Sequence, residues 1–286
     1  MIKSPPMRVS TFLARRFVAG DTIDEAVGVV RVLNQAGLKA TLDNLGEDTR
    51  ARQTALSAAE ENLRVLRAVA EAGVDANVSL KLTQLGLAFD EGLARESLIR
   101  IVEEAARLKN FVRIDMEGSA WTRKTLDLFY SLHDEHSNLG IVLQSALRRT
   151  EADARLAVQR RARVRLCKGA YREPADIAFP VKREVDASYD RCAQALAKAP
   201  LPAFATHDDA RIEAARRACA AAGLSPSDYE LQMLYGLRPR RWRELREQGH
   251  VVRIYVPYGT HWFAYFCRRL RERKENLLFV LRNLFE

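Results

Sequence analysis

Eight short apolar or β-branched runs alternate along this chain with longer segments whose apolar residues recur at helical spacing. The runs cover residues 40–45, 76–82, 111–117, 140–145, 163–168, 202–207, 229–234 and 250–256. The helical segments between them cover residues 49–72, 90–108, 121–133, 151–161, 181–197, 210–222 and 240–247. Because no linker or low-complexity segment separates these βα units, the pattern predicts a single (β/α)8 barrel of the TIM type.

A helical extension precedes the repeating units. Its clearest part is residues 21–36, with Asp21 or Thr22 as the N-cap and Gly37 after its end. We therefore expect one α/β domain over residues 1–286, of which residues 1–38 are the N-terminal helical extension. A doubly wound open sheet is the alternative, because strand order cannot be read from sequence. The G-x-G-x-x-G fingerprint of a dinucleotide-binding open sheet is missing.

The chain carries a formal net charge of +9. This excess favours an anionic partner: a nucleic acid, a phosphorylated cofactor, an acidic substrate or an anionic membrane surface. No RNA-binding or helix-turn-helix pattern accompanies the arginines, so we expect no nucleic-acid partner. The four cysteines show no paired spacing and are expected to be free thiols in a reducing compartment. No apolar run approaches the roughly 18 residues of a membrane span, so we expect a cytoplasmic protein that contacts the inner membrane face at most peripherally.

In a (β/α)8 barrel the active site lies at the carboxyl ends of the strands. Polar residues lie at or near these ends in seven of the predicted strands: Asp43, Asn44, Glu47, Lys81, Gln84, Asp115, Glu117, Gln144, Arg165, Lys168, Tyr171, Thr206, His207, Tyr255 and Tyr258. Each has a structural alternative, such as a helix cap for Asp115, a core histidine for His207 or an outward-reaching side chain for Lys81. Their shared position nevertheless favours an active site.

The charges at this rim favour an anionic ligand, such as a pyrophosphate together with a small carboxylate. The predicted cations are Lys81, Arg165, Lys168, Arg268 and Arg269. Gly169 follows Lys168 and allows the backbone to approach a flat or phosphorylated ligand. A metal-dependent hydrolase using Asp115, Glu117, His207 and Asp208 is an alternative, although no HxH or ExxH spacing supports it. We expect no metal site.

A charged stripe follows the last strand. Tyr265, Arg268, Arg269 and Glu272 recur at helical spacing on one face of a predicted helix. Two neighbouring guanidinium groups can hold a carboxylate through charge-assisted hydrogen bonds. The structural alternative is an ordinary solvated helix face.

Several segments together resemble the proline dehydrogenase family, in its single-function bacterial form. They are VSLKLTQLG at 78–86, VRIDMEG at 112–118, VLQSAL at 142–147, VRLCKGAYRE at 164–173, FATHDD at 204–209, ELQMLYG at 230–236, and YVPYG followed by WFAYFCRRLRE within 255–272. The resemblance implies an FAD-dependent barrel that oxidises L-proline to Δ1-pyrroline-5-carboxylate, the first step of proline catabolism. A hydride would pass from proline C5 to flavin N5 and the electrons on to a quinone. The product would pass to a pyrroline-5-carboxylate dehydrogenase, and hydroxyproline or another cyclic secondary amine is the alternative substrate.

The resemblance also implies roles for individual residues. Those expected to be catalytic are Asp115, Tyr171 and Arg165. Those expected to bind substrate are Lys81, Arg268 and Arg269 at the carboxylate, and Tyr255, Tyr265 and Leu234 around the ring. Those expected to bind FAD are Gln144, Arg165, Lys168, Gly169, Ala170, Thr206, His207 and Glu272. The helix after the eighth strand would be displaced onto the carboxyl-end rim, which would turn its charged stripe over the site.

Overall fold

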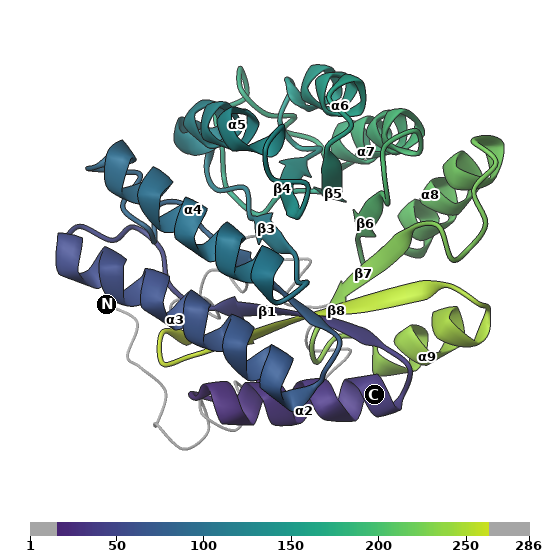
Figure 1. The fold of residues 1–286 in the computed structure, drawn as a ribbon. Coiled ribbons are helices and arrows are strands. Elements are labelled where there is room, and N and C mark those ends of the chain that lie inside the picture. Colours follow the sequence, from purple (N-terminus) through teal and green to yellow (C-terminus); the bar gives the residue numbers. More distant parts are fainter. Residues whose placement is uncertain (1–15, 263–286) are drawn as a thin grey trace, which may run out of the picture.

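The computed structural model of the chain describes residues 16–262. Its strands form a closed parallel barrel in chain order, in which β1 pairs with both β2 and β8 (Figure 1). The strands are β1 Lys39–Asn44, β2 Ala76–Leu80, β3 Val112–Ile114, β4 Leu139–Gln144, β5 Arg163–Cys167, β6 Ala203–Ala205, β7 Glu230–Leu234 and β8 Val251–Tyr258. The predicted (β/α)8 barrel is confirmed, and the alternative of an open sheet is wrong.

The predicted helices lie on the outside of this barrel (Figure 1). They are α3 Arg52–Ala72, α4 Glu91–Arg107, α5 Ser119–His133, α6 Thr150–Gln159, α7 Lys182–Leu196, α8 Asp209–Ala221 and α9 Pro239–Glu247. None of the helices in residues 16–262 combines the length and apolar character needed to cross a membrane. Cys192 and Cys219 are free thiols, as predicted, and Cys267 lies outside the described residues.

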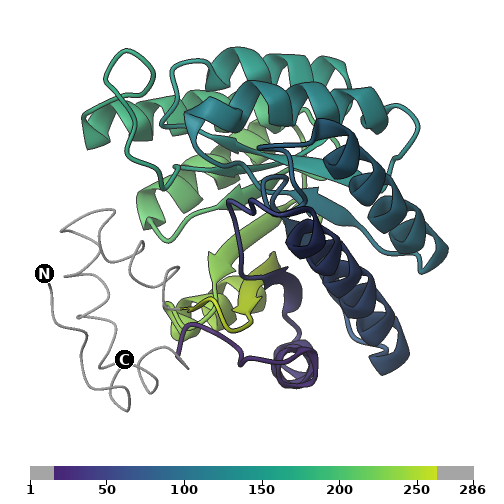
Figure 2. The same cartoon turned by 90° about the vertical axis from the view of Figure 1, so that its left-hand side faces the viewer.

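Helix α2 (Ile23–Gln35) confirms the helix predicted over residues 21–36, while residues 1–15 of the expected extension lie outside the described residues. Thr22 is its N-cap: the Thr22 side chain accepts from the Glu25 backbone N–H, and Glu25 accepts from the Thr22 N–H, a capping box. The helix packs against β1, β8 and α3, and Figure 2 shows it end-on outside the barrel. It therefore covers the wall where the barrel closes. The predicted displaced helix after β8 lies outside the described residues, and the single domain over residues 1–286 stays a prediction.

The hydrophobic core lies between the strands and the helices. Successive side chains of a strand point to opposite faces, and the outward-facing ones are apolar. Leu42 of β1 and Leu80 of β2 belong to one buried cluster with Leu66 of α3 and Leu98 of α4. Burying one such side chain stabilises the fold by about 1.5–3 kcal/mol. This apolar layer between strands and helices explains why the eight strands could be recognised in the sequence from their apolar residues.

The inside of the barrel is polar. Branched aliphatic side chains fill the interior of most such barrels. Here the inward-facing positions, which alternate with the apolar outward-facing ones, carry mainly polar and charged residues that are buried or largely buried. They are Thr41, Asp43, Asn77, Ser79, Arg113, Asp115, Arg163, Arg165, Glu230, Gln232, Arg253 and Tyr255. Gly140 of β4 helps to accommodate them, because a Cβ there would lie 2.5 Å from Cζ of Phe111 and 3.1 Å from Nη1 of Arg113. Hydrogen bonds across this interior position the candidate site.

Candidate functional site

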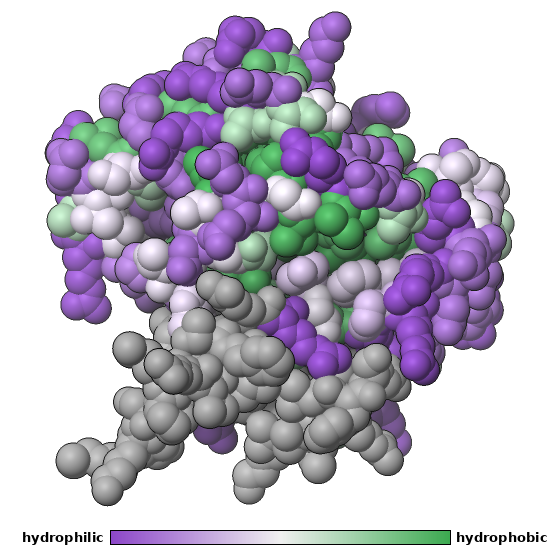
Figure 3. Space-filling view, turned by 90° about the horizontal axis from the view of Figure 1, so that it is seen from below, coloured by the Kyte–Doolittle hydropathy of each residue, from purple (hydrophilic) through white to green (hydrophobic). Residues whose placement is uncertain are grey.

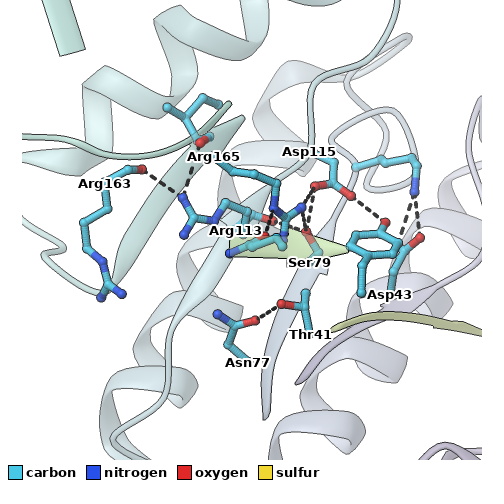
Figure 4. A network of polar contacts seen from close by, with 12 residues as sticks. Thr41, Asp43, Asn77, Ser79, Arg113, Asp115, Arg163 and Arg165 are labelled. Carbon is cyan, nitrogen blue, oxygen red and sulfur yellow. Dashed lines mark hydrogen bonds and ion pairs between the residues drawn. The ribbon is translucent and has the colours of Figure 1, made fainter. Parts of the chain in front are cut away.

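Asp115 is the centre of a buried hydrogen-bond network at the carboxyl end of β3 (Figure 4). Its Oδ1 accepts hydrogen bonds from the Ser79 hydroxyl at 2.7 Å and from Nη1 of Arg165 at 2.8 Å. Its Oδ2 accepts one from the Tyr255 hydroxyl at 2.7 Å. These partners come from β2, β5 and β8. The alternative of a helix cap for Asp115 is therefore wrong, because both carboxylate oxygens face the barrel interior.

Arg165 reaches from β5 across the barrel. Its Nε donates to Oε1 of Gln232 on β7 at 2.6 Å, and its guanidinium carbon lies 5.2 Å from the centre of the Tyr255 ring. Its Nη2 is buried and has no hydrogen-bond partner among the described residues. A buried guanidinium nitrogen without an acceptor is costly. This nitrogen is therefore a donor that an acceptor on a bound group would satisfy.

Lys81 lies just after β2 and is buried. Its ammonium group donates to the two carboxylate oxygens of Asp43 at 3.2 and 3.1 Å. Burial by itself lowers the pKa of Lys81, but the carboxylates of Asp43 and Asp115 outweigh this effect, and its pKa is raised above the ordinary value. Lys81 is therefore a fixed cation, and the alternative of an outward-reaching side chain is wrong.

Two of the three residues expected around the substrate ring are neighbours. Leu234 of β7 and Tyr255 of β8 are register partners in adjacent strands, so their side chains lie on the same face of the sheet. Tyr171, expected at the flavin, is half-buried after β5, and its Cδ1 lies 3.7 Å from the position that a Cβ on Gly118 would take. Leu234 is thus next to Tyr255, a member of the Asp115 network, and Tyr171 is near enough to Lys81 to act on its charge.

Except for Glu272, which lies outside the described residues, the residues expected to bind FAD gather at the carboxyl ends of β4, β5 and β6. Gln144 ends β4 and donates to the backbone carbonyl of Glu117 at 2.8 Å. Gly169 has φ of 106°, and a Cβ there would lie 3.0 Å from Oε1 of Gln144. Ala170 follows Gly169 and is half-buried. Position 169 therefore requires a glycine, both for its positive φ and for the close approach of its backbone to the Gln144 side chain.

Thr206 and His207 follow β6. The Thr206 hydroxyl accepts from the backbone N–H of Asp208 at 3.2 Å. The His207 Nε2 accepts from the backbone N–H of Leu234 at 2.9 Å. This bond requires a lone pair on Nε2 and therefore sets the ring tautomer. It ties the end of β6 to the end of β7.

Three of the five cations predicted at the rim lie in the described part of the chain, and all three are paired with carboxylates. Lys168 is held between two carboxylates, 2.6 Å from Asp186 and 2.7 Å from Asp208. Burial raises the pKa of Asp208, but the nearby lysines outweigh it and lower its pKa to about 2. Lys81 and Arg165 are paired as well. The expected excess of positive charge is therefore wrong for these three cations, because acidic side chains from other elements neutralise them.

Sequence reasoning left several partners out of the site. The sequence places Asp43 at the rim but indicates no role for it, and it does not indicate Ser79, Gln232 or Asp186, which the structure shows as partners of site residues. Ser79 and Gln232 could have been found from the two-residue period of a strand, because Ser79 precedes Lys81 by two positions and Gln232 precedes Leu234 by two. Asp186 gave no comparable signal, because it belongs to helix α7.

The metal-hydrolase alternative receives no support from the described part of the chain. Among residues 16–262, no group of three His, Cys, Asp or Glu side chains is arranged to hold a metal ion. Asp115 and Glu117 instead accept hydrogen bonds from side chains of neighbouring elements. The remaining predicted site residues, Tyr265, Arg268, Arg269 and Glu272, lie outside the described residues.

The fold and this site define a (β/α)8 barrel with a charged, buried centre at the carboxyl ends of its strands. A family model described as proline dehydrogenase matches residues 26–282. The chain therefore belongs to the proline dehydrogenase family and is an oxidoreductase.

Individual relatives agree with this assignment. Proline dehydrogenase 1 of Bacillus subtilis subsp. natto is 42% identical over 278 residues, which cover 96% of this chain and 91% of that protein. Proline dehydrogenase of Deinococcus radiodurans is 36% identical over 280 residues, with coverage of 96% and 90%. The crystal structure of proline utilization A from Bdellovibrio bacteriovorus, inactivated by N-propargylglycine, has a TM-score of 0.87 at 25% identity. That match covers 94% of this chain and 33% of the larger protein, so this chain spans about a third of it.

Proposed function

We propose that this chain oxidises L-proline to Δ1-pyrroline-5-carboxylate, the first step of proline catabolism, with FAD as its cofactor. Membership of the proline dehydrogenase family over residues 26–282 supports the reaction class. The observation that carries the proposal is the network in which Asp115 holds both Arg165 and Tyr255 at the barrel centre. The network gives a rigid, polar site beside the apolar side chain of Leu234.

Two features of the structure fit a bound flavin. The buried Nη2 of Arg165 lacks an acceptor among the described residues, and a nitrogen or carbonyl oxygen of a flavin ring would supply one. The close approach of Gly169 to Gln144 leaves backbone, not a side chain, at the end of β5. The residues proposed to hold FAD are those expected from the sequence: Gln144, Arg165, Lys168, Gly169, Ala170, Thr206, His207 and Glu272.

FAD, when bound, accepts the hydride that leaves proline C5. The chain's own residues bind and orient the substrate. Lys81 is proposed to attract the proline carboxylate together with Arg268 and Arg269, while Leu234, Tyr255 and Tyr265 pack around the ring. Asp115 is proposed to fix Arg165 and Tyr255 in place, and Tyr171 to exclude water beside the ring. Positioning and electrostatics are therefore the contribution of the protein.

The proposal includes the partners that act after the oxidation. We propose that a quinone accepts the electrons and that a pyrroline-5-carboxylate dehydrogenase consumes the product. The likeness to a bifunctional protein, PutA of Escherichia coli, is consistent with such a sequence of reactions; it is 30% identical over 323 residues, covering 94% of this chain and 24% of that protein. We further propose a cytoplasmic protein that contacts the inner membrane face peripherally.

One face of the molecule is relevant to membrane contact. Figure 3 shows a mainly hydrophilic surface with an interrupted apolar area on the face seen from below. The most exposed large apolar side chains are dispersed, with Val32 on α2, Val181 at the start of α7 and Leu201 before β6. Electrostatic attraction by the +9 charge is thus the proposed basis of contact. Pelleting with anionic liposomes should fall as salt is raised, and salt-independent pelleting would contradict it.

The reaction itself is tested by adding L-proline anaerobically to the FAD-loaded protein. The flavin absorbance in the visible region should bleach, and the product should react with an aldehyde reagent for pyrroline-5-carboxylate. A protein that remains colourless after incubation with FAD would overturn the cofactor assignment. Bleaching by hydroxyproline in preference to proline would transfer the proposal to the alternative substrate.

A further inference from the structure

A cavity of about 670 Å³ opens at the amino-terminal ends of the strands, opposite the candidate active site. Its wall is built by the connections before β2, β3 and β4 and by the first residues of β5 and β8. Cavities of this size accommodate small molecules. We call it the amino-terminal cavity.

Guanidinium groups dominate the interior layer behind this cavity. Arg163 and Arg253 line it, and Arg113 lies beside them with 1% of its surface exposed. Arg253 is bound to both carboxylate oxygens of Glu230, at 2.9 and 2.8 Å. Among residues 16–262, Glu230 is the one interior carboxylate for three arginines in this layer, and the half-exposed Asp75 lies 3.9 Å from Nη1 of Arg253.

Arg163 forms no ion pair with any residue of the described chain. Its guanidinium carbon lies 3.9 Å from the centre of the Phe111 ring, and its Nε is buried without a partner. Burial lowers the pKa of Arg163, Glu230 raises it, and the positive charge of Arg253 lowers it further. An anion in contact with this guanidinium would relieve both the missing hydrogen bond and the repulsion.

Two further groups of the wall can serve such an anion. Asn77 lines the cavity and is 5% exposed, and its Oδ1 accepts from the Thr41 hydroxyl at 2.5 Å, which fixes the amide so that its NH2 group is the donor on the other side. Lys109 is exposed at the mouth. The carboxylate of Asp75 also lines the cavity, and Lys39 holds it at 3.0 Å. The wall as a whole therefore keeps an excess of cations.

We propose that the amino-terminal cavity binds a small oxyanion, a carboxylate or a phosphate group, through the guanidinium of Arg163. The planar fork of an arginine matches two oxygens of either group, which an ammonium does not. Asn77 adds a neutral donor and Lys109 a positive charge at the entrance. The amino-terminal face of such barrels serves stability and not catalysis, so the bound anion stabilises the fold by binding the native state.

Isothermal titration of the purified protein with inorganic phosphate, and separately with succinate, tests the site. The wild-type protein should bind one anion per chain saturably, and the tighter of the two probes identifies the favoured oxyanion. Arg163→Met should weaken binding at least about 10-fold, since it removes charge-assisted hydrogen bonds. Arg123→Met is the matched control: that side chain is 83% exposed on helix α5 and does not line the cavity, so binding should be unchanged.

Two milder variants keep the test decisive if Arg163→Met does not fold. Arg163→Lys keeps the charge but loses the fork, and should still weaken binding several-fold. Lys109→Asn suits a position with φ of 55°, which Asn tolerates, and should weaken binding up to about fivefold. Absence of saturable binding to the wild type, or unchanged affinity in all the Arg163 and Lys109 variants that fold, would overturn the proposal. Proline turnover is not needed for either result.

Discussion

Glu230→Gln tests whether the buried ion pair at the start of β7 stabilises the barrel. Both carboxylate oxygens of Glu230 accept from Arg253, and Oε2 also accepts from Nε2 of Gln232 at 2.6 Å. Burial raises the pKa of Glu230, but Arg253 outweighs this effect, and the pKa falls from 4.5 to about 2. A carboxyl group with a lowered pKa stabilises the folded state above its unfolded pKa, and this stabilisation is lost as pH falls through the folded value.

The size of this effect follows from the same two values. A pKa that falls from 4.5 to about 2 on folding corresponds to about 3 kcal/mol of stability at neutral pH. Urea unfolding of wild type and Glu230→Gln at a series of pH values measures it. The difference in free energy of unfolding should be about 3 kcal/mol at pH 7 and should shrink between pH 4.5 and pH 2.

A surface ion pair provides the control for this experiment. Glu60 contacts Arg100 with about half of each side chain exposed, so Glu60→Gln should change the free energy of unfolding by less than about 1 kcal/mol. If Glu230→Gln also costs less than that, the pair does not stabilise the fold. If its cost is large but the same at pH 7 and pH 3, the loss comes from packing and the ionisation argument is refuted.

Three further changes probe the candidate site. Asp115→Asn leaves a buried guanidinium without its anion, so the free energy of unfolding should fall by about 3–5 kcal/mol and proline turnover should drop sharply; wild-type stability by urea unfolding would contradict this. Gly169→Ala forces φ of 106° on a residue with a Cβ and brings that atom 3.0 Å from Gln144, so FAD affinity, measured by flavin fluorescence, should weaken; unchanged affinity would remove this position from the cofactor site. Arg268→Met or Arg269→Met should raise KM for proline strongly while the protein stays yellow, and an unchanged KM would show that the carboxylate binds elsewhere.

The elements of the barrel could be predicted because their apolar residues follow strict periods. The outward faces of the strands are buried against helices, which leaves a clear pattern in the sequence. Strand lengths were less predictable. The apolar run 111–117 exceeds β3, which ends at Ile114, because Asp115 and Glu117 turn to accept hydrogen bonds from Ser79 and Thr83.

The residues of the candidate site could be predicted from the sequence, but the ion pairs between them could not. Lys81 meets Asp43 across the adjacent strands β1 and β2, whereas Arg165 of β5 meets Asp115 after β3 because the closed barrel directs both side chains into its interior. Sequence spacing contains no such distance, so the cations were expected to act as free charges. Lys168 is likewise paired, with Asp186 of helix α7, which its position in the sequence does not indicate.

The pairing of charges inside the barrel differs between its two ends. Near the carboxyl end, Arg165 and Lys81 each have a carboxylate of their own, so this layer is close to neutral and rigid. Near the amino end, Arg113 has no carboxylate at hydrogen-bond distance among the described residues; burial lowers its pKa, and the positive charge of Arg165 lowers it further. The same repulsion acts on Arg165 in turn, which strengthens its need for the Asp115 carboxylate. The two layers are therefore coupled through the barrel axis, and an anion bound in the amino-terminal cavity would reduce the field felt at the site on the other side.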